Sequence, residues 1–283
     1  MSVNTEQLME QIRLARNNDL GAPRKISDRT KIVGLIKKCQ VILLPGYYHY
    51  NSLTPEDALN ELQVDLIGEL TSALCFSGKN LMKAGELTDA FLNSLPHIME
   101  LLNTDIQAIY DGDPAAKSKA EVILCYPGFY AISIYRIAHE LYTLGVPYIP
   151  RIMTEYAHEK TGIDINPGAA IGPYFCIDHG TGIVIGETAV LGHHVKLYQG
   201  VTIGAKSFEK DADGNPVKGG KRHPDVGNHV VIYANATILG GDTVIGDYCV
   251  VGGSVWLLES LPSYSVIVHQ VGEDQIFTAK PKK

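Results

Sequence analysis

The chain has 283 residues, of which 45% are hydrophobic, and its formal net charge at pH 7 is −7. This length exceeds that of most single domains, so two domains with a sizeable core are expected, and general disorder is excluded. The acidic balance argues against a nucleic-acid partner, because neutralising phosphates requires a basic face.

The N-terminal stretch MSVNTEQLMEQIRLARNN has no basic segment followed by an apolar run, so no secretory signal or targeting peptide is expected. The most apolar later segment, 122–150, contains Arg136, His139 and Glu140, which a membrane span would hold only at a cost. The five cysteines are widely spaced and form no CxxC pair, as is typical of reduced thiols. These features predict a cytoplasmic protein without a membrane partner.

The chain up to residue 158 has a helical rhythm. Leucines mark one face of a predicted helix, at Leu59, Leu62, Leu66 and Leu70. Thr54 offers an N-cap for this helix, with Pro55 at the first helical position. The segment GFYAISIYRIAHELYTLG predicts a long buried helix that ends at Gly145. An all-α domain is therefore predicted for residues 1–158.

From Ile165 the period of the aliphatic residues changes to six. They stand at Ile165, Ile171, Ile177 and Ile183, then at Ile185, Leu191, Leu197 and Ile203, and after an interruption at Val226, Ile232, Ile238, Ile245, Val251 and Leu257. Continuous hexads are a signature of a parallel β-helix, in which three hexads close one triangular coil. Such hexads indicate the left-handed form, an exception to right-handed crossover connections. The predicted fold class is thus α+β: the all-α domain, a left-handed parallel β-helix over 159–262, and a tail over 263–283.

Glycine follows the inward aliphatic residue at six places, where a tight corner is expected to need a permissive backbone: Gly172, Gly186, Gly192, Gly227, Gly246 and Gly252.

The hexad rhythm slips at three places. Two residues are extra immediately after Asp178-His179, and one is extra around Gly240-Gly241. Between them a long excursion predicts one extruded loop over 204–225, which returns carrying Arg222 and His223. Irregular insertions in stacked strands re-aim side chains and occur beside functional sites. The histidines at two of the slips are therefore candidate site residues.

A histidine with a carboxylate partner can act as general base on a substrate hydroxyl. His179 is the expected base. Asp164 is its expected partner, because neighbours in a strand point to opposite faces and Asp178 would point away from the His179 ring. The guanidinium of Arg222 can hold a carboxylate in a two-pronged hydrogen bond. No G-x-S-x-G elbow and no Cys–His pair is present in the sequence, so a covalent nucleophile is not indicated.

Two long stretches of the sequence resemble one enzyme family. TGIDINPGAAIGPYFCIDHGTGIVIGETAVLGHHVKLYQGVTIGA followed by GGKRHPDVGNHVVIYANATILGG is similar to serine O-acetyltransferase, a hexapeptide-repeat acyltransferase. The similarity extends upstream through DIQAIYDGDPAA and PGFYAISIYRIAHELY, so that it covers about residues 105–262. The combination of DHGTGIVIGETA, RHP and the upstream DPA is specific to this family.

The resemblance implies an acetyl transfer from acetyl-CoA to the hydroxyl of L-serine. It implies that His179 deprotonates this hydroxyl in a ternary complex and that Asp164 completes the dyad. The implied substrate contacts are Asp178, Arg222, His223, Asp113 and Pro114. The implied CoA contacts are Gly204, Ala205, Ala234 and Gly253. No metal is implied. CoA would lie between adjacent prisms, in a homotrimer or a dimer of trimers, and L-cysteine would inhibit at the serine site.

Three features differ from the family pattern. Asn166 stands where the family commonly has histidine, and VHQVGEDQIF replaces the usual G-x-P-A-R segment near the C-terminus. The chain ends in TAKPKK, whereas family members that dock into the sulfhydrylase end in isoleucine, so that association is not expected.

Three other functions are compatible with parts of the pattern. A hexapeptide acetyltransferase acting on a sugar or antibiotic hydroxyl would share His179 but would not need Arg222. A γ-type carbonic anhydrase would bind zinc through three histidines, for which His179, His193, His194 and His223 are the candidates. A non-catalytic scaffold would use the solenoid as a binding surface and release no thiol from acetyl-CoA.

Overall fold

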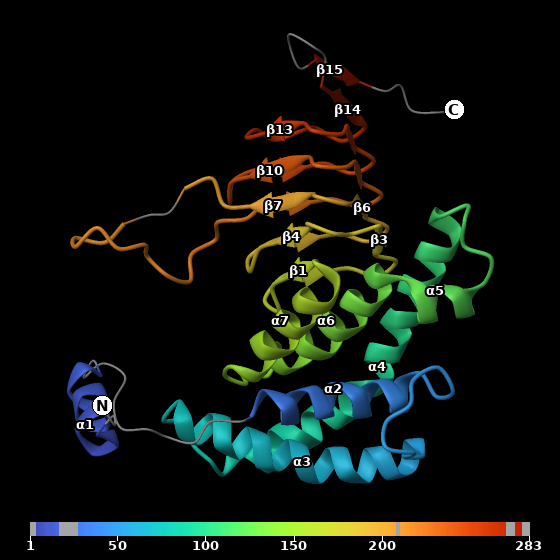
Figure 1. The fold of residues 1–283 in the computed structure, drawn as a ribbon. Coiled ribbons are helices and arrows are strands. Elements are labelled where there is room, and N and C mark those ends of the chain that lie inside the picture. Colours follow the sequence, from blue (N-terminus) through green and yellow to red (C-terminus); the bar gives the residue numbers. More distant parts are fainter. Residues whose placement is uncertain (1–3, 17–27, 208–209, 270–274, 279–283) are drawn as a thin grey trace.

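The computed structural model describes residues 4–16, 28–207, 210–269 and 275–278. Figure 1 shows a helical half below a stack of short strands. The helices in these ranges are α1 Thr5–Ala15, α2 Arg29–Leu43, α3 Pro55–Phe76, α4 Lys83–Gly112, α5 Lys119–Cys125, α6 Pro127–Thr143 and α7 Ile149–Thr161. None of these helices combines the length and hydropathy needed to cross a membrane.

The strands form three sheets, each of which is one face of a triangular prism. The first sheet contains β1 Asp164–Ile165, β4 Val184–Ile185, β7 Thr202–Gly204, β10 Thr237–Leu239 and β13 Trp256–Leu257. The second contains β2 Ala170–Ile171, β5 Val190–Leu191, β8 Asp225–Val226 and β11 Val244–Ile245. The third contains β3 Cys176–Asp178, β6 Lys196–Tyr198, β9 Val231–Ile232, β12 Val250–Val251, β14 Ser265–Val268 and β15 Gln275–Thr278.

Consecutive strands pass from one sheet to the next, so the chain coils around the prism. All pairings between the strands of the described residues are parallel except that of β14 with β15. This arrangement confirms the predicted parallel β-helix. One long loop joins β7 to β8, and its described part leaves the prism beside β7 (Figure 1).

The hexad positions fill the interior of the prism. In the first sheet Ile165 pairs with Ile185, Ile185 with Ile203, and Ile203 with Ile238. All of these side chains are buried, so each coil stacks an aliphatic residue on the one before it. Ile183 is also buried, at the corner before β4, because the two extra residues after Asp178-His179 move the strand position to Ile185.

The corner glycines serve close packing rather than turn formation. None of the six predicted positions has a positive φ, so the expectation of a special backbone conformation was wrong. A Cβ on Gly192 would lie 2.4 Å from the Asn228 side chain and 2.9 Å from the Gly227 backbone. A Cβ on Gly186 would lie 2.0 Å from the His223 ring. Glycine is required because the next coil, or a side chain beside it, occupies that space.

Most of the features predicted for the helical half are confirmed by the structure. Thr54 caps α3 by accepting a hydrogen bond from the N–H of Asp57, and Pro55 is the first helical residue. Three of the four leucines of α3 are fully buried, whereas Leu59 is 40% exposed and lies off the packed face. The helices end at Thr161 and the first strand begins at Asp164.

A buried ion pair joins the helical half to the first coil of the prism. Arg136 of α6 donates two hydrogen bonds to Asp105 of α4, at 2.9 and 3.0 Å. The same guanidinium donates to the carbonyl of Gly172 at 2.7 Å, and Asp105 accepts from the N–H of Phe175 at 2.9 Å. Both side chains are almost fully buried. Arg136, one of the polar residues that interrupt the apolar segment 122–150, therefore joins the helical half to the prism.

Candidate active site

His179 lies at the corner where the chain passes from the third sheet to the first. It directly follows β3, and its φ of 59° is in the left-handed region. Its side chain is 74% exposed, and its Nε2 lies 3.9 Å from Oδ1 of Asp178. The expectation that Asp178 points away from this ring was wrong. The alternation of side chains does not apply, because His179 lies outside the strand and its backbone turns there.

Asp113 enters the same site from the helical half, as the residue that ends α4. Its carboxylate accepts hydrogen bonds from the Tyr126 hydroxyl at 2.6 Å and from the N–H of Ala115 at 2.8 Å. These two bonds, and after them the charges of Lys196 and His179, hold the pKa of Asp113 below its ordinary value. The bond to Asp113 also raises the pKa of Tyr126 to about 12. Asp113 is therefore an anion near His179 at neutral pH, and the exposed Pro114 follows it.

Lys196 of β6 joins the Asp178 carboxylate to the backbone at the end of α4. Its Nζ donates to the carbonyl of Gly112 at 2.7 Å and lies 3.3 Å from Oδ2 of Asp178. It thereby ties the end of α4 to the end of β3. The sequence patterns singled out neither Lys196 nor Tyr126, because their roles depend on how α4 packs against β3 and against α5.

Asp164 lies one coil before His179 and does not contact it. Asp164 pairs in register with Val184, and its Oδ1 is 4.0 Å from the guanidinium of Arg151. Within the described ranges no hydrogen bond or ion pair joins Asp164 to His179. The N–H of Gly182 donates to the carbonyl of Gly162 at 2.8 Å, so the turn after His179 stacks on the segment that leads into Asp164. The dyad of these two residues stays a prediction.

Arg222 and His223 lie at a different corner, between the first and second sheets. Their backbone N–H groups donate to the hydroxyl of Thr188 at 3.0 and 3.1 Å, and Nδ1 of His223 accepts from the N–H of Thr188 at 3.1 Å. Burial, and after it the charge of Arg222, lowers the pKa of His223 to about 4. The His223 ring is therefore neutral, with its proton on Nε2.

The Arg222 guanidinium is held by a carboxylate of its own chain. It donates to Glu187 at 2.5 Å, and Glu187 also accepts from the Tyr142 hydroxyl at 3.1 Å. The hydrogen bond from Arg222 lowers the pKa of Glu187, which is therefore ionised.

The four predicted CoA contacts divide between the two edges of the first sheet. Ala234 and Gly253 lie at the corner that also carries His179, where the N–H of Ser254 donates to the carbonyl of Ala234 at 2.8 Å. Gly204 and Ala205 lie at the opposite edge, at the end of β7. The structure therefore brings Gly204 and Ala205 near Arg222, and Ala234 and Gly253 to the side of His179.

An open hollow of about 610 Å³ lies at the root of the loop, beside Gly204 and Ala205. Its lining includes Lys206, Lys221 and Arg222, together with Gly240 and Gly241 of the third slip in the hexads. Two of these three cations are paired with carboxylates, Lys221 with Asp225 and Arg222 with Glu187, and Asp242 also lines the hollow.

The histidines proposed for a carbonic anhydrase do not come together in one chain. His179 and His223 lie at two separate corners, whereas His193 and His194 lie at the third, between the second and third sheets. There they meet His229, which was not among the candidates. Burial, and after it the charges of His229 and His193, lowers the pKa of His194.

The known proteins to which this chain is similar include members of one enzyme family. Residues 47–133 match the family model described as serine acetyltransferase, N-terminal. A serine acetyltransferase of Staphylococcus aureus is 39% identical over 187 residues, which are 65% of this chain and 82% of that protein. A plasmid serine acetyltransferase of Synechococcus elongatus is 55% identical over 184 residues, 65% of this chain. The chain spans 57% of the length of that relative and 54% of one from Synechocystis.

Solved structures of the same family share the fold. Serine acetyltransferase 1 of Entamoeba histolytica, in complex with L-cysteine, superposes with a TM-score of 0.74 and 33% identity, covering 94% of this chain and 96% of that one. A Brucella abortus serine acetyltransferase in complex with coenzyme A gives a TM-score of 0.60 at 28% identity, covering 77% of this chain and 82% of that one. These similarities confirm the predicted helical region followed by a left-handed β-helix.

Proposed function

Because the chain belongs to the serine acetyltransferase family, we propose that it transfers the acetyl group of acetyl-CoA to the hydroxyl of L-serine. The products are O-acetyl-L-serine and free CoA. The observation that carries this proposal is an exposed histidine, His179, flanked by two carboxylates, Asp113 and Asp178, from different halves of the chain. Such a site suits a substrate with both a hydroxyl to be deprotonated and an ammonium group to be held.

In this mechanism His179 is the general base. Its imidazole takes the proton of the serine hydroxyl, and the oxygen attacks the thioester carbon of acetyl-CoA. As the carbon–sulfur bond breaks, the imidazolium returns the proton to the CoA sulfur. A positioned base contributes roughly 10² to 10⁴-fold to such a step. Asp164 completes the dyad in this proposal by orienting the imidazole from the coil below.

The carboxylates Asp113 and Asp178 hold the serine ammonium group beside this base. Both belong to the corner of His179, and the Tyr126 and Lys196 contacts fix their positions. Pro114 lies next to Asp113 and shapes the same side of the site. Ion pairing at this point selects an amino acid over a sugar, which has a hydroxyl but no ammonium group.

The carboxylate clamp, Arg222 with His223, comes from a second copy of the chain. Within one chain, Arg222 and His179 lie at opposite edges of the first sheet. This face is about six residues wide, which corresponds to roughly 15–20 Å at about 3.3 Å per residue. A bound serine is far smaller than that distance. The site is therefore completed between adjacent prisms, in a homotrimer or a dimer of trimers.

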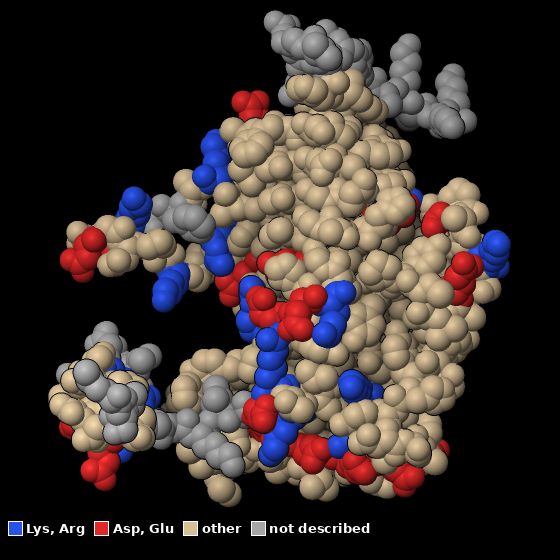
Figure 2. Space-filling view, in the orientation of Figure 1, with Lys and Arg blue, Asp and Glu red and all other residues tan. Residues whose placement is uncertain are grey.

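The outer surface of the prism supports this packing. Apolar residues point outward from the first and second sheets, with Val184 37%, Val190 44%, Val244 48% and Trp256 62% exposed. Figure 2 shows few charged side chains over the prism and many over the helical half and the loop. Exposed apolar faces of this kind mark sites of protein–protein contact.

The same arrangement accommodates acetyl-CoA as co-substrate. Ala234 and Gly253 come from the prism that supplies His179, and Gly204 and Ala205 come from the neighbour. Lys206 lines the hollow beside Gly204 and would meet the phosphate groups, whereas Lys221, which also lines it, is paired with Asp225. The complex of the Brucella abortus relative with coenzyme A supports CoA binding in this family.

We also propose that L-cysteine inhibits the enzyme by occupying the serine site. Cysteine differs from serine by one atom and offers the same ammonium and carboxylate groups. The Entamoeba histolytica relative was solved in complex with L-cysteine. A cytoplasmic location remains part of the proposal.

The proposed reaction is tested by incubating the purified protein with acetyl-CoA and following the release of CoA thiol. Release that depends on L-serine and is inhibited by L-cysteine is expected. Release only with sugar or antibiotic hydroxyls would identify the rival acetyltransferase, and no release with any acceptor would favour a scaffold. Arg222→Ala should raise the KM for serine more than the KM for acetyl-CoA, because it acts on the amino-acid carboxylate.

Replacing Lys196 by methionine should raise the KM for L-serine about tenfold, because a charge-assisted bond that positions Asp178 is lost. Methionine keeps most of the chain length of lysine, so the packing of β6 is retained. Steady-state rates at varied serine concentrations measure the effect. Lys218→Met, on the exposed part of the loop, is the matched control and should leave this KM unchanged. An unaltered KM in Lys196→Met would show that Lys196 has no positioning role.

A further inference from the structure

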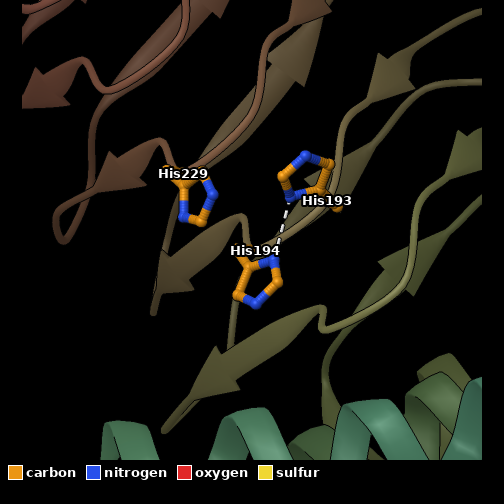
Figure 3. A group of neighbouring side chains, drawn as sticks. All are labelled: His193, His194 and His229. Carbon is orange, nitrogen blue, oxygen red and sulfur yellow. Dashed lines mark hydrogen bonds between the residues drawn. The ribbon is translucent and has the colours of Figure 1, made fainter.

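Three imidazoles meet at the corner between the second and third sheets, away from the proposed active site. His193 and His194 follow β5, and His229 follows β8, which pairs with β5 on the next coil. Figure 3 shows the three rings gathered outside the strands. Their nitrogens include one from each ring that all lie within 4.8 Å of one another. We call these residues the histidine trio.

The three rings are close enough to share a ligand, but two of them are stacked. The rings of His194 and His229 have centroids 4.6 Å apart, so their in-plane nitrogen lone pairs run side by side, and the ring of His193 stands edge-on to both. Nδ1 of His193 and Nδ1 of His194 are 2.9 Å apart and share a hydrogen bond. A tetrahedral ion with bonds of about 2.0–2.1 Å to imidazole nitrogen brings its nitrogens to about 3.3–3.4 Å from one another. Binding therefore requires the His194 and His229 rings to rotate out of their stack so that all three nitrogens face one ion.

The backbone of the coils holds the trio in place. The N–H of His229 donates to the carbonyl of His193 at 2.9 Å, and the N–H of His194 donates to the carbonyl of Pro173 at 3.1 Å. The N–H of His193 donates to the Asn228 side chain at 3.0 Å. The backbone of each histidine is thus held by a bond to a neighbouring coil, so the three side chains start from fixed positions on the prism.

Tyrosine rings enclose the stacked pair on both sides. Tyr174 stacks on His194 at 4.2 Å, and Tyr248 stacks on His229 at 4.7 Å. These four residues all have φ between 54° and 59°, so the same corner of successive coils presents its side chains in one column. The rings leave the imidazole edges, where the nitrogens are, as the part that can accept an ion.

We propose that His193, His194 and His229 bind one divalent transition-metal ion of the zinc class, with a fourth position open to water. Three imidazoles without a carboxylate suit Zn²⁺, Cu²⁺, Ni²⁺ or Co²⁺, whereas Mg²⁺ and Ca²⁺ require oxygen ligands. The ion would join two coils through side chains in addition to their backbone bonds. This inference does not depend on the proposed reaction, because none of the three residues takes part in it.

A second group of candidate ligands, Glu155, His158 and Asp164, serves as an internal comparison. Its acidic members already face cationic groups: Glu155 forms an ion pair with Arg151, and Asp164 lies 4.0 Å from the same guanidinium. A metal ion there would have to displace this arginine. Among the described residues, no arginine or lysine forms an ion pair at the histidine trio.

The test uses the full chain after treatment with a chelator and dialysis. Calorimetric titration with Zn²⁺ should show one saturable site per chain, and titration with Co²⁺ should give the visible absorption of a nitrogen-ligated ion. Zn²⁺ should also raise the Tm, because the ion binds only the folded chain. His229→Asn should weaken Zn²⁺ binding roughly 100-fold or more, since loss of a mere supporting partner already costs 10–100-fold.

The variants are chosen so that loss of a ligand is separated from loss of the fold. Asparagine tolerates the left-handed φ of 54° at position 229. Tyr248→Asn changes the neighbouring ring of the column at the same backbone conformation and should keep Zn²⁺ binding. His158→Gln removes a ligand of the other group and should bind as the wild type does. His193→Gln provides a second ligand deletion if His229→Asn is unstable.

The proposal is overturned if the wild-type chain shows no saturable binding of Zn²⁺ or Co²⁺. It is equally overturned if both ligand deletions keep wild-type affinity, or if His158→Gln is the variant that loses the ion.

Discussion

Replacing His179 by asparagine should lower kcat by roughly 10² to 10⁴-fold, because the serine hydroxyl then has no positioned base. Asparagine is the appropriate substitution, since it accepts the left-handed φ of 59° at this corner and cannot take the proton. The rate of CoA thiol release at saturating L-serine and acetyl-CoA measures the effect. Binding of acetyl-CoA should change little.

His97→Asn is the matched control for this variant. His97 is exposed on α4 and its nearest charged partner is Glu100 of the same helix, so its replacement should leave kcat unchanged. A His179→Asn enzyme with wild-type kcat would rule out His179 as the base. It would leave the family assignment intact but require another residue to take the proton.

Replacing Arg136 by methionine should lower the free energy of unfolding by about 3–5 kcal/mol, because Asp105 is left charged and buried without its partner. The loss also removes the bond from the guanidinium to the carbonyl of Gly172 in the first coil. Urea denaturation followed by circular dichroism measures the change, and a lower midpoint with an unchanged slope is expected.

The double variant Asp105→Leu with Arg136→Met tests the reason for this loss. It removes both charges, so it should be more stable than Arg136→Met alone. A surface pair provides the comparison: Arg29 and Glu159 are both about half exposed, and Arg29→Met should cost about 1 kcal/mol or less. A loss for Arg136→Met as small as that for Arg29→Met would contradict the proposed coupling of the two halves.

The β-helix could be predicted because each six-residue repeat of the sequence corresponds to one face of a coil. An aliphatic residue is needed at the same position of each coil to fill the interior of the prism, as Ile185, Ile203 and Ile238 do. The physical reason for glycine at the corners could not be predicted from the repeat. Gly192 lies against the Gly227 backbone of the next coil. This contact depends on which coils stack on each other, and the residue pattern within one coil does not predict how closely they approach.

The site was predictable only in part. The first slip in the hexads indicated Asp178 and His179, and the structure places them at one corner. Lys196 stands at an ordinary outward position of β6, and only its contacts with Gly112 and Asp178 in the folded chain give it a role. Asp113 entered through the family resemblance, because the packing of α4 against β3 has no local signal in the sequence.

The separation of the two corners could not be predicted from the sequence either. Both His179 and Arg222 stand beside irregularities of the repeat, and the pattern does not say on which edge of a sheet each one lies. In the folded chain one lies on each edge of the first sheet, and Arg222 pairs with Glu187 of its own chain. A site that needs both residues therefore has to combine two chains.

Mixing two inactive variants tests this claim most directly. His179→Asn and Arg222→Ala chains are co-expressed, purified as mixed oligomers, and assayed for serine-dependent thiol release at a serine concentration where each variant alone is inactive. With random assembly in a closed ring, about a quarter of the interfaces join an intact His179 to an intact Arg222 of the neighbour. The account predicts recovery of about that share of the wild-type rate, whereas a mixture as inactive as its components would show that both residues act within one chain.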